Sequence, residues 1–426
     1  MQKLKTEYTQ SEFGNIPKDW RIVNLEDLSF RIMKGIFDLN PVNYVKEGIP
    51  FLRISDIKNN TIEIEATKFI SKDLNKKFPS SQLYPGDLVI SKVGSVGLSD
   101  KIAKIPNSIS CCNISQNLIG IKLDNQKLYS DYLLLLLQLP SYMSRVTSGS
   151  NTTTLKSIQL EVLRKLPIIH PPINEQQKIA SILSSVDELI QKIEQIIEQT
   201  QRLKKGVMQR LLTKGVGHTK FKKTELGDIP EKWSISSIGE KCKLGTGGTP
   251  SRSKLVYYTG SIPWVKTAEI NFKTIISTEE HITEQALEES SAKLYPKDTL
   301  LMAMYGQGIT RGRSAILGMD AAINQACAAI RSLGEISIQF LFYWCQMQYD
   351  NIRRISQGSH QANLNLEQVA SIKIPCPPIK EQKEIEKMLL HVDSLLQIKI
   401  IQKSKYEKLK KGLMQKLLTG KIRVKV

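Results

Sequence analysis

Four loop segments of this 426-residue chain carry side chains that could contact a nucleic acid. Residues 92–97 and 305–313 are rich in glycine and polar residues, and residues 147–154 and 357–363 form polar stretches. Arg, Gln and Asn side chains can read base edges in a groove, while Lys and Ser hold phosphates. Together with two residues at predicted strand ends, the candidates for DNA contact are Arg53, Lys92, Ser95, Asn151, Thr152, Lys266, Gln307, Arg311, Arg313, His360, Gln361 and Asn363.

The residues offer no catalytic constellation. An Asn/Asp-Pro-Pro-aromatic motif and a glycine-rich SAM loop, which a DNA methyltransferase needs, are both missing, and Pro250 interrupts the glycine-rich stretch 245–250 where a phosphate-binding helix would begin. The five histidines and six cysteines show no metal-ligand spacing, and the thiols are expected to be buried and reduced. We therefore predict no catalytic residue, no metal and no bound cofactor.

The chain repeats itself. Residues 171–179, which read Pro-Pro-Ile-Asn-Glu-Gln-Gln-Lys-Ile, return at 377–385 as Pro-Pro-Ile-Lys-Glu-Gln-Lys-Glu-Ile. The Leu-Lys-Lys-Gly stretch at 203–206 returns at 409–412. Shorter matches pair the strand-like segments of the two halves, such as Ile-Pro-Phe-Leu from Ile49 with Ile-Pro-Trp-Val from Ile262. A duplicated chain predicts two similar domains and a two-site function.

Each Pro-Pro-x-x-Glu-Gln copy opens a stretch with apolar residues spaced three and four apart, the pattern of a coiled-coil helix about 60 Å long. Two such helices are expected to pair antiparallel, although each could instead join a coiled coil in an oligomer. Lys399 and Gln402 place polar groups at core positions of the second helix. The predicted core of the helix pair is Ile179, Ile182, Val186, Leu189, Ile193, Ile385, Met388, Val392, Leu395 and Leu409.

These elements predict a mixed α/β (α+β) chain with a pseudo-twofold, quasi-circular arrangement. The predicted parts are an N-terminal arm with a first globular domain (1–170), a central long helix (171–216), a second globular domain (217–373) and a C-terminal long helix (374–426). Because residues 5–20 resemble 218–233, which follow the first helix, the N-terminal arm is expected to pack beside the end of the second helix at Leu418-Thr419-Gly420.

Composition favours a polyanionic partner. The formal net charge is +19 and the isoelectric point is near 9.5, so nucleic acid is favoured over a membrane, although a general lysine bias would raise the isoelectric point as well. The longest apolar run, residues 132–139, is too short to cross a bilayer, and the N-terminus lacks a signal-peptide core. A cytoplasmic protein is expected.

The order of these motifs over essentially the whole chain resembles the specificity subunit of type I restriction-modification systems. The resemblance rests on the Ile-Pro-aromatic strands at Ile49 and Ile262, the Gly-Gly-Thr-Pro-Ser-Arg stretch from Gly247, and the Pro-Gly-Asp turn at Pro85. It rests also on the two Pro-Pro-x-x-Glu-Gln helix starts.

This resemblance implies two target-recognition domains that each read one half of a bipartite double-stranded DNA target, with the helices setting the spacer. It also implies a non-catalytic chain that docks two methyltransferase subunits and, where present, two restriction subunits, so that SAM, ATP and Mg²⁺ reside on the partners. Two alternatives stay open on sequence grounds: a non-specific basic coiled-coil adaptor, and a self-sufficient DNA-modifying enzyme.

Overall fold

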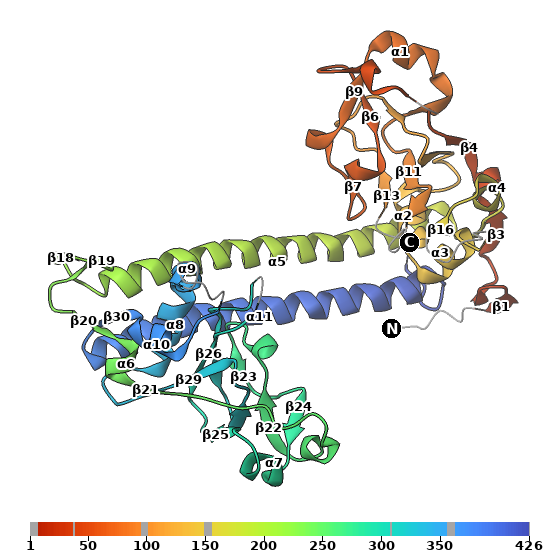
Figure 1. The fold of residues 1–426 in the computed structure, drawn as a ribbon. Helices are drawn as coiled ribbons and strands as arrows, with labels where there is room; N and C mark the ends of the chain where they lie inside the picture. The colour runs from red at the N-terminus through yellow and green to blue at the C-terminus, as the bar shows by residue number, and fades with distance from the viewer. Residues whose placement is uncertain are drawn as a thin grey trace. The chain divides into compact units, whose positions relative to one another are not determined.

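The chain folds into two compact units. The computed structural model describes residues 7–36, 39–94, 101–148, 156–306, 309–355 and 363–425. The first unit comprises residues 1–194 together with 402–426, and the second comprises residues 195–401. Each long helix therefore contributes one part to each unit (Figure 1).

The first unit contains two larger sheets with helices beside them. The five-stranded sheet has the order β10 (Gln82–Leu83), β14 (Cys112–Ile114), β6 (Ile49–Leu52), β9 (Lys68–Ile70) and β5 (Tyr44–Val45). The four-stranded sheet has the order β13 (Ile102–Lys104), β11 (Leu88–Ser91), β15 (Leu118–Leu123) and β4 (Ser29–Lys34). Four two-stranded pairs join β1 (Tyr8–Ser11) to β2 (Gly14–Pro17), β3 (Arg21–Asn24) to β17 (Pro167–His170), β7 (Ile57–Lys58) to β8 (Thr61–Ile62), and β12 (Val93–Gly94) to β16 (Lys156–Ser157). The short helices are α1 (Lys72–Lys77), α2 (Ser130–Leu137), α3 (Pro140–Val146) and α4 (Leu160–Arg164).

The second unit repeats this plan with different details. Its five-stranded sheet has the order β21 (Cys242–Thr246), β29 (Cys327–Ser332), β26 (Leu300–Ala303), β27 (Ser314–Leu317) and β23 (Thr274–Ile275). Its four-stranded sheet has the order β24 (Glu280–Ile282), β22 (Ile262–Val265), β28 (Ala321–Ile323) and β25 (Lys293–Tyr295). Two pairs join β18 (Phe221–Thr224) to β19 (Gly227–Pro230) and β20 (Ser234–Ser237) to β30 (Lys373–Cys376). The short helices are α6 (Ile238–Lys241), α7 (Glu284–Glu288), α8 (Ile338–Met347), α9 (Tyr349–Ile355) and α10 (Leu366–Ser371).

The two Pro-Pro-x-x-Glu-Gln motifs open the long helices α5 (Ile173–Lys214) and α11 (Ile379–Leu417), as predicted. Gly215 ends α5 in the left-handed region at φ 65°, which favours glycine. Each domain core takes in the start of one long helix and the end of the other. Ile179 of α5 and Leu417 of α11 belong to the core of the first unit, and Leu212 of α5 and Ile385 of α11 belong to that of the second.

The glutamine of each motif is buried and fully hydrogen-bonded to main chain. The Gln176 side-chain amide donates to the carbonyls of Lys127 at 3.1 Å and Pro171 at 2.8 Å, and its oxygen accepts from the Tyr129 N–H at 2.8 Å. Gln382 makes the same three types of bond, to Glu335, Pro377 and Ser337. The amide therefore ties the start of each long helix to the loop before a domain helix, which explains why this residue is repeated.

The glutamate of each motif binds the repeated tryptophan and a basic side chain that follows the end of the other long helix. Glu175 accepts from Trp20 Nε1 at 3.0 Å and from Arg423 at 2.7 and 2.8 Å. Glu381 accepts from Trp233 Nε1 at 2.9 Å and lies 2.7 Å from His218 Nε2. Arg423 and His218 each stand three residues after the glycine that follows a long helix, Gly420 or Gly215.

The N-terminal arm packs beside the C-terminus, as predicted from the resemblance of residues 5–20 to 218–233. The Tyr8 hydroxyl donates to the Gly420 carbonyl at 3.3 Å. Arg423 donates to both Asp19 carboxylate oxygens at 2.9 Å, and these bonds, after those to Glu175, raise the pKa of its guanidinium. The two ends of the chain therefore close the first unit together.

Interhelical ion pairs establish that α5 and α11 run antiparallel within each unit. In the first unit, Asp187 pairs with Lys410 at 2.7 Å and Glu194 pairs with Lys403 at 2.6 Å. In the second unit, Lys204 pairs with Asp393 at 2.5 Å. The residue numbers of every pair add to 597, so one antiparallel register holds in both units.

The predicted helix-pair core is only partly buried. Ile179, Val186, Ile193 and Ile385 are buried, and Ile182 and Val392 are half-buried. The core prediction is wrong for four residues, whose exposed fractions are 42% for Leu189, 39% for Met388, 44% for Leu395 and 48% for Leu409. Exposed Leu189 lies between buried Val186 and buried Ile193, so the three-and-four spacing of apolar residues does not by itself determine which of them are buried.

The Asp187–Lys410 pair provides a test of the register. Replacing Lys410 with Glu should lower the free energy of unfolding by about 1 kcal/mol, because two carboxylates would then face each other at a partly exposed site. Adding Asp187→Lys should restore most of the loss in urea unfolding. A double variant no more stable than Lys410→Glu alone would contradict this pairing.

Candidate nucleic-acid interface

In the first domain, main-chain hydrogen bonds join the start of the glycine-rich loop to two other segments of the chain. Lys92, which opens the glycine-rich loop, donates its N–H to the Asn117 carbonyl at 2.8 Å, and its own carbonyl accepts from Ile158 at 2.8 Å. The Ser115 N–H donates to Leu52, the last residue of β6, at 2.9 Å. The end of β6 before Arg53, the turn 115–117, Lys92 at the start of the glycine-rich loop, and Ile158 therefore lie together.

The second domain repeats this frame. The Met304 N–H donates to the Ala326 carbonyl at 2.9 Å, and the Met304 carbonyl accepts from Leu364 at 2.9 Å. The Asn324 N–H donates to Val265, the last residue of β22, at 3.0 Å. Met304 thus occupies the place of Lys92. The main-chain frame is common to both domains, and the side chains that it presents differ.

Of the residues predicted to contact DNA, those that the structure describes are Arg53, Lys92, Lys266, Arg311, Arg313 and Asn363. Lys92, Arg311 and Arg313 are half-buried, and Asn363 is exposed. The predictions for Ser95, Asn151, Thr152, Gln307, His360 and Gln361 fall outside the described residues.

Arg53 and Lys266 have carboxylate partners within their own domains. The Arg53 guanidinium binds Asp56, which is buried, at 2.9 Å, and the Asp56 carboxylate also accepts the Arg53 main-chain N–H at 2.9 Å. The same turn occurs in the second domain, where Glu269 accepts the Lys266 N–H at 2.8 Å. Both basic residues therefore stabilise the turn that follows a central strand.

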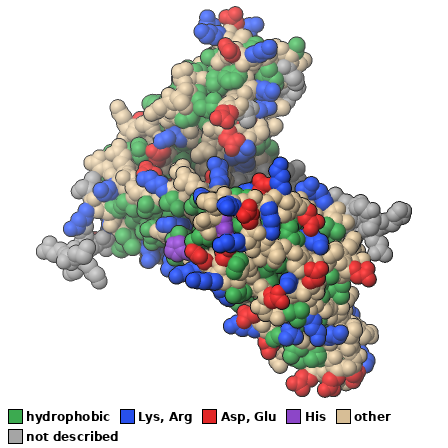
Figure 2. Space-filling model, turned by 90° about the vertical axis from the view of Figure 1, so that its left-hand side faces the viewer, with side chains coloured by type: hydrophobic (Ala, Val, Ile, Leu, Met, Phe, Trp, Pro, Cys, Tyr) green, Lys and Arg blue, Asp and Glu red, His purple; other side chains and the backbone are tan. Residues whose placement is uncertain are grey.

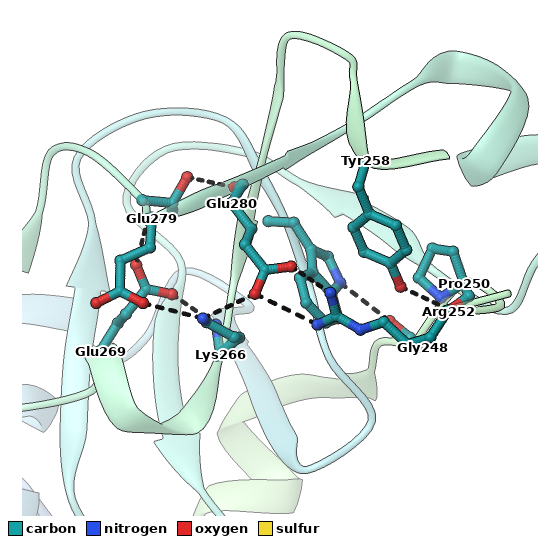
Figure 3. Close-up of polar contacts among 10 residues, drawn as sticks. Gly248, Pro250, Arg252, Tyr258, Lys266, Glu269, Glu279 and Glu280 are labelled. Atoms are coloured by element: carbon teal, nitrogen blue, oxygen red, sulfur yellow. Dashed lines mark hydrogen bonds and ion pairs between the residues drawn. The ribbon is translucent and has the colours of Figure 1, made fainter. Parts of the chain in front are cut away.

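The Lys266 ammonium lies in a network of charges that Figure 3 shows in close-up. It donates to Glu279 at 2.9 Å and Glu280 at 2.8 Å, and Arg252 also binds Glu280. Hydrogen bonds from Arg252 and Lys266 lower the pKa of Glu280, and the bonds to Glu280 and Glu279 raise the pKa of Lys266. These charges neutralise one another, so Lys266 is a weaker candidate for DNA contact than its sequence position suggested.

Amide side chains that the sequence analysis missed lie beside Arg53. A cavity of about 310 Å³ in the first domain is lined by Tyr44, Arg53, Ser55, Gln116 and Asn117, among others. Amides beside an arginine and hydroxyls are suited to read base edges. Comparing Ile-Ser-Gln-Asn from Ile114 with Ile-Asn-Gln-Ala from Ile323 would have found the repeated glutamine, which in the second domain is Gln325 and exposed.

Arginines gather beside the corresponding loops of the second domain. Gly312 lies against Arg353 of α9, since a Cβ at Gly312 would stand 3.1 Å from Arg353 Cγ. Arg354 follows on the same helix and is exposed. Among the described residues, the buried Nε of Arg313 has no hydrogen-bond partner. The Arg353-Arg354 pair was missed, although two adjacent arginines directly before a polar loop were a visible signal.

Net charge alone does not locate the interface. Figure 2 shows one face of the molecule, where Lys and Arg side chains are interspersed with Asp and Glu. In the described part of the chain, no three or more His, Cys, Asp and Glu side chains form a group that could hold a metal ion. None of the described helices has the length and apolarity needed to span a membrane.

Two similar domains, each presenting its own set of polar loop side chains on a shared frame and each joined to the same two long helices, define a two-site recognition scaffold. The chain belongs to the type I restriction-modification DNA specificity family, whose domain model matches residues 17–202 and 230–411.

Similar proteins support this assignment. The chain is 31% identical to the putative type I restriction enzyme MjaX specificity subunit of Methanocaldococcus jannaschii, covering 98% of this chain and 97% of the relative. It is 28% identical to the MjaVIII specificity subunit of the same organism, over 100% of this chain and 98% of the relative. The solved S subunit from M. genitalium has the same fold, with a TM-score of 0.57 at 16% identity, and covers 93% of this chain and 96% of its own.

Proposed function

We propose that this chain is the DNA-reading subunit of a type I restriction-modification complex, with each recognition domain contacting one half of a bipartite target. The observation that carries the proposal is the duplicated loop frame with unlike side chains. Lys92 stands in one domain where Met304 stands in the other, and Asn117 stands where Ala326 does. Identical frames with different donors and acceptors are suited to read two different half-sites.

We propose further that the long helices dock two methyltransferase subunits. Leu189, Met388, Leu395 and Leu409 are exposed apolar residues on α5 and α11, and Leu203, Ile398 and Ile401 add to them with exposed fractions of 59%, 57% and 53%. These exposed apolar side chains are available to pack against a partner protein. The methyltransferase subunits would carry SAM, and restriction subunits, where present, would carry the ATP and Mg²⁺ chemistry.

The two alternatives make different predictions for the purified chain. A self-sufficient enzyme would modify DNA with SAM or Mg²⁺ alone, whereas a specificity subunit would do so only with its methyltransferase partner. A non-specific basic adaptor would show no sequence preference in a DNA selection. The duplicated frame and the family membership favour the specificity subunit.

Mapping methylated adenines in cells that carry this chain and its partner tests the proposal. A split motif with two half-sites is expected.

Inserting seven residues into both long helices, so that the Asp187–Lys410 and Lys204–Asp393 pairs are kept, would lengthen each helix by about 10 Å. The gap between half-sites should then grow by about three base pairs at 3.4 Å each. An undivided motif would refute the two-site function, and an unchanged gap would refute the helices as spacer.

A further inference from the structure

The edge strand of the first domain presents an exposed phenylalanine at a β-bulge. Among the described strands, β4 pairs only with β15 and ends the four-stranded sheet. Ser29 pairs with Leu123 and Arg31 with Lys122, so Phe30 has no partner residue. Its side chain is 75% exposed. Bulges on edge strands commonly re-aim a side chain next to a functional site.

A basic cavity of about 500 Å³ lies along this strand. Its lining includes Phe30, Arg31 and Lys34 of β4 and Arg164 of α4, with Ser29 and Ser80 as hydroxyl donors. Glu26 is the carboxylate that lines it. The positive groups exceed the negative one, and an aromatic ring stands among them.

These cations differ from the neutralised ones of the second domain. Arg31 and Lys34 are exposed and form no salt bridge with any described residue, and Arg164 has only an exposed partner, Glu161, at 3.7 Å. Arg164 also donates to the Ile32 carbonyl at 3.5 Å, which holds α4 against β4. By contrast, Arg252, Lys254 and Lys266 are all bound to carboxylates.

The cavity adjoins the loop frame of the same domain. Directly after β4, the Gly35 N–H donates to the Leu118 carbonyl at 3.3 Å and the Ile36 N–H donates to Ile114 at 2.8 Å. These bonds place the end of β4 beside the turn 115–117. In the repeat, the Gly248 N–H donates to the Ile323 carbonyl as the Ile36 N–H does to Ile114, so Lys243 of β21 matches Arg31 and Thr246 matches Lys34. β21 pairs with β29 without a bulge, so Phe30 has no counterpart in the second domain.

We infer that this cavity is a second DNA contact of the first domain, which binds the sugar–phosphate backbone next to the half-site. Arg31, Lys34 and Arg164 bind phosphates, and Phe30 packs against the sugar or base of a neighbouring nucleotide. Such contacts add affinity without reading sequence. The inference rests on the proposed DNA-binding function, and it makes the first domain hold DNA more tightly than the second.

The test uses the full chain assembled with its methyltransferase partner, and measures binding of cognate and scrambled duplexes at several salt concentrations. Phe30→Ala should weaken both duplexes by about tenfold. Lys34→Gln and Arg31→Gln should each weaken both and reduce the salt slope by about 0.9. Lys72→Ala, at an exposed lysine of α1, is the matched control and should change neither. Thermal unfolding of each variant establishes that it is folded.

Unchanged affinity of folded Phe30→Ala and Lys34→Gln variants would overturn the inference, provided that the unaltered complex binds DNA. A loss confined to the cognate duplex would overturn it as well, since it would indicate base reading. If the unaltered complex binds a mononucleotide at micromolar concentration, and the variants lose that binding but keep their affinity for DNA, the cavity binds a free nucleotide instead. If the unaltered complex binds no DNA, the proposed function itself fails.

Discussion

Replacing Glu175 with alanine is expected to lower the free energy of unfolding by about 3 kcal/mol. Glu175 is 1% exposed, and its removal leaves Trp20 Nε1 without its acceptor and leaves the Arg423 guanidinium with Asp19 alone as a carboxylate partner. Removing one partner of a buried charge pair costs about 3 to 5 kcal/mol, and the partial exposure of Arg423 favours the lower value. Urea unfolding measures this change.

Two further variants sharpen this test. Glu161→Ala is the matched control, because that carboxylate lies on the surface and its loss should change the free energy by less than about 0.5 kcal/mol. Glu175→Ala combined with Arg423→Ala should be less destabilised than the sum of the two single variants, because the two groups interact directly. Additive losses of the two single variants, or a loss below about 1 kcal/mol for Glu175→Ala, would mean that the Glu175–Arg423 pair does not stabilise the fold.

Replacing Arg311 and Arg313 with glutamine is expected to alter recognition of one half-site while the other half-site is kept. Each lost base contact should cost about 1 to 3 kcal/mol in binding free energy. Arg331→Gln, at an exposed arginine on β29 of the same domain, serves as the control for loss of positive charge. The measurement is a comparison of duplexes that carry substitutions in one half-site or the other.

The outcome distinguishes contact with bases from contact with phosphates. Relaxed specificity confined to one half-site would place these arginines on bases of that half-site. Uniform weakening on all duplexes, with a smaller salt slope, would instead indicate phosphate contact and contradict the base-reading role. Equal effects of Arg331→Gln would show that net charge alone is responsible.

The sequence alone predicted those features of the fold whose signal is local or repeated along the chain. The Pro-Pro-x-x-Glu-Gln motifs predicted both long helices, because proline and the apolar spacing act within a few turns of the chain. The likeness of residues 5–20 to 218–233 predicted the contact of the N-terminal arm with the C-terminus, which the Tyr8–Gly420 hydrogen bond confirms. The duplication itself implied two domains on one plan.

Other features depend on residues that are far apart in the chain. No local pattern distinguishes Lys266, which two carboxylates neutralise, from Arg31, which has no described salt bridge. The exposure of Leu189 and Leu409 depends on how the helices turn against each other and against the domain cores. The sequence around Phe30 is that of an ordinary strand, and only the pairing of β4 with β15 reveals the bulge that leaves Phe30 without a partner.

The sequence by itself therefore determined the repeat, the helices and the family, because these follow from local propensity and from order along the chain. The tertiary structure decided which charges are neutralised, which apolar residues remain exposed, and that Gln116 and Asn117 lie beside Arg53. The physical reason is that hydrogen bonds, ion pairs and burial join groups whose separation in sequence, such as 248 residues between Glu175 and Arg423, carries no local signal.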